Sequence, residues 1–143
     1  MKKMGIIAAV ALLAIAATGC KQAPKYALTD GQWVLISWQD DADQEIVVTA
    51  NRPTMTFDTA GTVTGFAGCN DFSGRYEQSG EKITVDMGAM TMKMCLDMES
   101  EDRMAKQMPL VTAFEIDGNQ LILFNADGQE LFRFDNTAAE AQQ

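Results

Sequence analysis

Hydrophobic and polar residues alternate along most of the chain beyond residue 30. Short segments in which every second residue is apolar predict β-strands, and the stretches rich in glycine, asparagine and aspartate between them predict turns. The strands are predicted at residues 32–39, 46–49, 54–58, 62–67, 72–78, 82–86, 89–94, 120–124 and 130–134. Residues 125–128 (Asn-Ala-Asp-Gly) separate the last two strands and have a composition typical of a hairpin turn.

One segment has a helical period instead. Between residues 97 and 114, the side chains of Met104, Met108 and Val111 recur at spacings of three and four, as on one face of a helix. Pro109 lies within this face and predicts either a kink or the start of a second short helix. Many short strands and one helix predict an α+β fold, a strongly curved and mostly antiparallel sheet closed by that helix.

The first 20 residues differ from the rest. Lys2 and Lys3 precede an uncharged apolar segment that is too short to span a membrane as a helix. The segment ends in Ala-Thr-Gly-Cys, which predicts a signal peptide over residues 1–19 and a lipid on Cys20. An ordinary cleaved signal with an incidental cysteine is the alternative.

These features divide the chain into four parts: a lipoprotein signal peptide (1–19), a lipidated tether (20–27), one domain (28–135) and a polar tail (136–143). They predict a protein of the bacterial cell envelope that contacts the membrane through its N-terminal lipid. The residue after Cys20 is Lys21. An aspartate at this position would resemble a signal that retains lipoproteins in the inner membrane. We therefore expect the lipid to lie in the outer membrane, with the domain facing the periplasm.

The chain is acidic. It has 20 acidic and 11 basic residues, and removing residues 1–19 leaves 20 and 9, a net charge of −11. That balance argues against nucleic acid as a partner. The negative charge keeps the protein soluble, or it favours binding to a basic protein partner.

Two cysteines, Cys69 and Cys95, remain once Cys20 is acylated. An even pair in an oxidising compartment usually forms a disulfide, and two free buried thiols are the alternative. The chain contains no histidine, which excludes serine or cysteine catalysis with a histidine base and argues against a zinc site. We therefore expect no enzymatic activity, no metal site of that kind and no cofactor.

Two blocks of sequence resemble the META (HslJ-like) family. The first runs from residue 55 to 76 and contains a glycine-cysteine-asparagine motif, and the second is the Met-Thr-Met-Lys-Met-Cys stretch of residues 90–95. An opening tryptophan strand at residues 31–35 and a closing segment at residues 114–123 complete the resemblance. The positions that carry the motif are Gly68, Cys69, Asn70, Phe72, Gly74, Tyr76, Thr91, Met92 and Cys95.

The resemblance implies a cracked β-barrel with a helix and a stress-related envelope lipoprotein, without implying a reaction. The glycines suit positive φ or close backbone approach. Asn70 suits a turn that its own side chain stabilises. The motif is thus expected to be architectural rather than a binding site.

Seven methionines fall within residues 87–108. On a strand, Met90, Met92 and Met94 share one face. They can fill the core, line a groove for a peptide or lipid, or bind Cu(I), which prefers soft ligands. The matching apolar helix face at Met104 and Met108 favours the core.

Three functions remain. The preferred one is a non-catalytic envelope lipoprotein that binds an envelope component, an unfolded protein or a small ligand under stress. The second is an inhibitor of a basic exported protein such as a lysozyme, favoured by the acidic charge. The third is a soft-metal binder, favoured by the methionines.

Overall fold

The computed structural model describes residues 22–137, so the predicted signal peptide and Cys20 lie outside the described residues. The described chain forms a nine-stranded antiparallel sheet and one short α-helix. The elements are β1 (Trp33–Gln39), β2 (Glu45–Val47), β3 (Thr54–Phe57), β4 (Thr62–Phe66), β5 (Asp71–Ser79), β6 (Lys82–Met90), α1 (Glu99–Gln107), the 3-10 turn η1 (Met108–Leu110), β7 (Val111–Asp117), β8 (Gln120–Asn125) and β9 (Glu130–Asn136).

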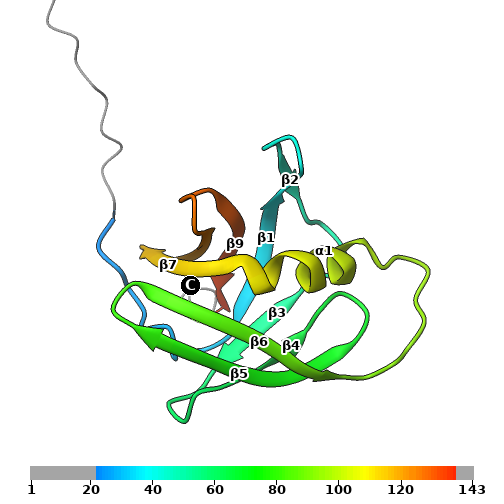
Figure 1. The fold of residues 1–143 in the computed structure, drawn as a ribbon, viewed down its shortest axis with the longest axis horizontal. Helices are drawn as coiled ribbons and strands as arrows, with labels where there is room; N and C mark the ends of the chain where they lie inside the picture. Colours follow the sequence, from blue (N-terminus) through cyan, green and yellow to red (C-terminus); the bar gives the residue numbers. More distant parts are fainter. Residues whose placement is uncertain (1–21, 138–143) are drawn as a thin grey trace, which may run out of the picture.

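The sheet closes on itself because β1 pairs with β9 as well as with β3. Eight strands form the barrel in the order β1, β3, β4, β5, β6, β7, β8, β9. Strand β2 pairs with the distal half of β1, beyond the part that β3 occupies, and projects from the barrel (Figure 1). The α+β, barrel-like class predicted from the strand pattern is confirmed.

The barrel has a weak seam between β6 and β7. These strands are joined at one register pair, Lys82 with Ala113, whereas β5 and β6 are paired from Phe72–Met90 to Ser79–Lys82. Beyond Lys82 the two strands separate, and α1 and η1 precede β7 on the side of β6 away from β5 (Figure 1). The seam is the crack that the resemblance implied.

The core lies inside the barrel and continues under α1. Met104 and Met108 are buried, so the helix contributes the apolar face that its spacing predicted. Trp33 is fully buried, and its indole N–H donates to the carbonyl of Leu28 over 2.8 Å, which fixes the start of the domain. The largest fully buried side chains are Trp33, Phe57, Phe132, Phe134, Leu35, Met55, Ile83, Met104, Met108, Leu121, Leu123 and Val63.

Two predicted elements are wrong in extent. The helix ends at Gln107, because Pro109 starts a 3-10 turn and the alternating residues from Val111 to Asp117 form β7. No separate strand covers residues 89–94. Strand β6 runs to Met90 through a bulge near Gly88, whose φ of 62° interrupts regular pairing, and residues 91–95 form a loop.

Candidate functional site

A disulfide joins the two motif blocks. Cys69 and Cys95 are bonded, with 2.00 Å between their sulfurs and 5.9 Å between their Cα atoms. Cys69 precedes β5 and Cys95 lies in the loop after β6, so the bond ties that loop to the barrel wall. The predicted pairing of these two cysteines is confirmed.

The neighbouring Asn70 is buried, and its side-chain amide connects three segments. The Oδ1 atom accepts hydrogen bonds from the Thr91 hydroxyl (2.8 Å) and the Lys93 backbone N–H (2.6 Å). The Nδ2 atom donates to the Lys93 carbonyl (3.1 Å) and to Glu101 Oε1 (2.8 Å). Two donors and two acceptor positions are the full capacity of an asparagine amide. No part of this side chain is left for a ligand.

Glu101 completes this arrangement from the first turn of α1. Its second oxygen, Oε2, accepts the Asn70 backbone N–H over 2.7 Å, so a buried carboxylate is held by two charge-assisted hydrogen bonds. The sequence placed Glu101 among acidic residues that suit a helix start. Its burial depends on tertiary contacts, and no sequence pattern indicated it.

The motif glycines have two distinct roles. Gly68 has a φ of 116°, and a Cβ there would lie 2.8 Å from the Cβ of Ser100 in α1. Gly74 lies so close to β6 that a Cβ would be 1.9 Å from the carbonyl oxygen of Asp86. Phe72, between them, is buried in the core. Gly68 and Gly74 therefore allow close approach of the chain to α1 and to β6.

Tyr76 continues the motif on β5. Its ring packs edge-on against Phe57, with 4.9 Å between the centroids, and its hydroxyl donates to the carbonyl of Asp58. Burial raises the pKa of the Tyr76 phenol, and the negative charge of Asp58 adds to that rise. The Thr62 backbone N–H lowers the pKa of the Asp58 carboxyl, so this charge persists.

The methionines separate into two groups, which corrects the expectation that Met90, Met92 and Met94 fill the core. Met92 is 98% exposed and Met94 is 95% exposed, because residues 91–95 leave the sheet and strand alternation no longer applies. Met90, the last residue of β6, is half-buried and packs against the core. Thr91 hydrogen-bonds to Asn70 and is exposed.

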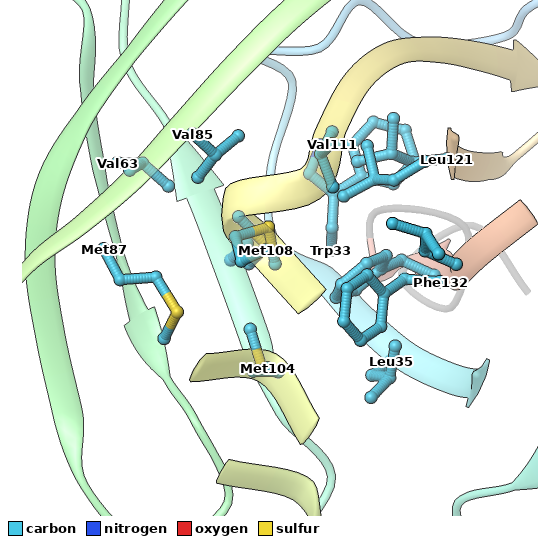
Figure 2. Close-up of a cluster of buried hydrophobic side chains, with 14 of the residues drawn as sticks. Trp33, Leu35, Val63, Val85, Met87, Met104, Met108, Val111, Leu121 and Phe132 are labelled. Atoms are coloured by element: carbon cyan, nitrogen blue, oxygen red, sulfur yellow. The ribbon is translucent and has the colours of Figure 1, made fainter. Parts of the chain in front are cut away.

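A groove opens at the barrel seam. Its cavity has a volume of about 620 Å³ and lies between β5 and β6 on one side and α1 and η1 on the other. Figure 2 shows the Met87 side chain of β6 pointing toward Met104 and Met108. Of these three residues, Met87 and Met108 line the groove and Met104 lies in the core. The lining residues are Arg75, Tyr76, Glu77, Thr84, Val85, Asp86, Met87, Gly88, Met90, Ala105, Met108 and Pro109.

Of the predicted groove residues, Met90 alone lines this cavity. Met87, Ala105 and Pro109 line it too, and the sequence did not single them out as a groove. The methionine-rich composition was the sequence feature that could indicate a groove. Its position could not be predicted, because the gap between β6 and α1 follows from the open seam.

Residues 22–137 contain no group of three or more cysteine, aspartate or glutamate side chains placed to hold a metal ion. No helix within the same residues is long and apolar enough to cross a membrane.

Residues 26–138 match the model of the META domain. The chain belongs to the META domain family. No curated protein shows significant sequence similarity to it. The matched residues include the whole segment that forms the disulfide, the Asn70 hydrogen bonds and the groove.

Three solved structures resemble this META domain. A protein from Burkholderia xenovorans, solved by NMR, is 20% identical, with a TM-score of 0.61 and coverage of 96% of this chain and 99% of that one. A second NMR structure is 22% identical, with a TM-score of 0.59, over 80% and 94% of the two chains. A DUF4847 family protein from Bacteroides vulgatus is 12% identical, with a TM-score of 0.56, over 76% and 93%. At these identities the likeness concerns the fold alone.

Proposed function

We propose that the protein is a non-catalytic binding module of the bacterial envelope, held at the outer membrane by a lipid on Cys20. Its ligands are extended, apolar segments of other envelope proteins, which stress exposes. The single observation that carries this proposal is the groove at the barrel seam, between β6 and α1.

The size and lining of the groove support a ligand of this kind. A cavity of about 620 Å³ lies within the range of roughly 300–1,000 Å³ typical of ligand pockets. Met87, Met90 and Met108 supply flexible, polarisable side chains that adapt to different apolar partners. Arg75 and Asp86 are exposed lining residues that form a polar rim.

The backbone of β6 supports an extended polypeptide rather than a compact small molecule. One edge of β6 pairs with β5 along its length, but the other pairs with β7 at Lys82 alone. From Thr84 to Met90 this second edge therefore has no partner strand among the described residues. An unpaired edge offers backbone N–H and C=O groups that an incoming strand can pair with.

The test uses a variant in which a bulky side chain narrows the groove and the core residues are unchanged. Ala105 is exposed on α1 and lines the groove, so Ala105→Trp fills the space with an indole. Ala126→Trp makes the same change at the exposed β8–β9 turn, away from the groove residues. The probe is reduced, carbamidomethylated α-lactalbumin, a permanently unfolded chain.

We expect the wild-type protein and Ala126→Trp to bind the probe equally and Ala105→Trp to bind it at least about tenfold more weakly, a difference of about 1.4 kcal/mol. Fluorescence anisotropy of the labelled probe measures the affinities. Equal binding by both variants, or no binding by the wild type, would refute the groove as the site.

A further inference from the structure

The loop that follows β6 exposes apolar sulfur-containing side chains to solvent. We call residues 90–96 the methionine loop. Met92 and Met94 are almost completely exposed, and Met90 stands half-buried at its start, beside the groove. We infer that the methionine loop binds a soft monovalent metal ion, Cu(I) or its analogue Ag(I), through the thioethers of Met90, Met92 and Met94.

The ligand chemistry of this segment is soft. Thioethers favour Cu(I) over hard cations, which prefer carboxylates and water. Cys69 and Cys95 are bonded to each other and present no thiolate, and the chain has no histidine. Among the described residues, thioethers are therefore the soft ligands available.

The loop backbone is held in place, whereas the side chains of Met92 and Met94 extend into solvent. The disulfide fixes Cys95, and Asn70 fixes the backbone of Lys93 through both its N–H and its carbonyl. An unbranched methionine side chain has three rotatable bonds, so thioethers two residues apart can converge on one ion. Binding then orders side chains alone, which limits its entropic cost.

The charges around the loop favour a cation. Lys93 lies between Met92 and Met94, but its ammonium group is 3.3 Å from the Asp71 carboxylate, which offsets its charge. Asp97 and Glu99 follow the loop and are exposed. The charged residues within and beside the loop thus carry more negative than positive charge, which attracts a cation.

This inference does not depend on the proposed function, although the two sites share Met90, which also lines the groove. Met92 and Met94 lie outside the groove lining. The two also face different tests. Leu96 is fully exposed as well, so the loop would suit an apolar protein contact in the same way. Leucine in place of methionine keeps the apolar character and removes the sulfur, which separates metal binding from apolar docking.

The test titrates the full chain with Ag(I), and with Cu(I) under anaerobic conditions in competition with bicinchoninate. Methionine methyl groups labelled with carbon-13 report the site by NMR. We expect the methyl signals of Met90, Met92 and Met94 to shift, while those of the fully buried Met55 and Met104 stay in place.

The variant with Met90→Leu, Met92→Leu and Met94→Leu should bind at least about tenfold more weakly. Met87→Leu, a methionine of the groove, is the matched control and should bind as the wild type does. Met92→Leu alone changes a fully exposed residue and keeps the test valid if the triple variant does not fold. Unshifted methyl signals, or unchanged affinity in the leucine variants, would overturn the assignment.

Discussion

Replacing Asn70 with alanine removes the amide that joins the start of β5, the methionine loop and α1. Its four side-chain hydrogen bonds span 2.6 to 3.1 Å, and one of them reaches a buried carboxylate. Each neutral bond contributes about 0.5–1.5 kcal/mol net, and a bond to a charged group contributes about 1.5–3 kcal/mol. Because water re-solvates part of the vacated site, we expect Asn70→Ala to cost about 3–5 kcal/mol.

Urea unfolding measures this loss. Trp33 and Trp38 are buried, and their fluorescence reports the barrel rather than the loop. With a slope of about 2 kcal/mol per molar, the midpoint of Asn70→Ala should fall by about 2 M. Thr91→Val removes one of the four bonds, and also the bond that the Asp71 backbone N–H donates to the Thr91 hydroxyl over 3.1 Å. At this exposed position the two losses should together cost about 1–2 kcal/mol.

A third variant, Asn70→Asp, tests the contact with Glu101. The introduced carboxyl would face a carboxylate oxygen that now lies 2.8 Å from the amide nitrogen. That neighbouring negative charge raises the pKa of the introduced carboxyl in the folded state. The stability of this variant relative to the wild type should therefore be lowest at neutral pH and recover as the pH falls through the raised pKa.

Two results would contradict this role of the Asn70 amide. One is a loss of stability in Asn70→Ala no larger than that in Thr91→Val. The other is a stability of Asn70→Asp relative to the wild type that does not change with pH.

Three further predictions concern the cysteines and the exposed methionines. Cys69 and Cys95 are 26 positions apart in sequence, so reducing the bond between them should lower the free energy of unfolding by roughly 3.5 kcal/mol in the chain-entropy model. Urea unfolding with and without reductant measures this loss, and equal midpoints would contradict it. Cys20→Ser should yield a soluble or uncleaved protein, and membrane fractionation that finds it as tightly bound as the wild type would contradict the predicted anchor. Dilute peroxide should oxidise Met92 and Met94 before the methionines of the core, because sulfoxide formation follows exposure; peptide mass spectrometry with equal oxidation at all sites would refute the exposure.

Much of the barrel was predictable, because apolar residues alternate with polar ones at the same period of two at which strand side chains point into the barrel. Strand β1, β5 and the β8–β9 hairpin appear close to their predicted bounds. The start of β7 was not predictable, since Met104, Met108 and Val111 are all buried at helical spacing although Val111 begins a strand. Only the tertiary fold brings the strand and the helix to the same core.

The candidate sites were predictable in part. Two cysteines in a chain with a predicted export signal indicated the disulfide. The alternating methionines wrongly predicted a strand that continues past Met90. Gly88 adopts a positive φ that interrupts the strand, and the spacing of the methionines does not indicate this. The groove depends on the separation of β6 from α1, and β6 pairs with the strand that follows α1 and η1 only at Lys82 and Ala113. Nothing in the sequence pattern indicates that this pairing stops there.

The most direct test of the proposed function is amide hydrogen exchange along β6 with and without reduced, carbamidomethylated α-lactalbumin. An extended segment that pairs with the free edge should slow exchange between Val85 and Met90 and leave the β8–β9 hairpin unchanged. Slower exchange at the hairpin or at β2, with β6 unaffected, would contradict binding at the seam.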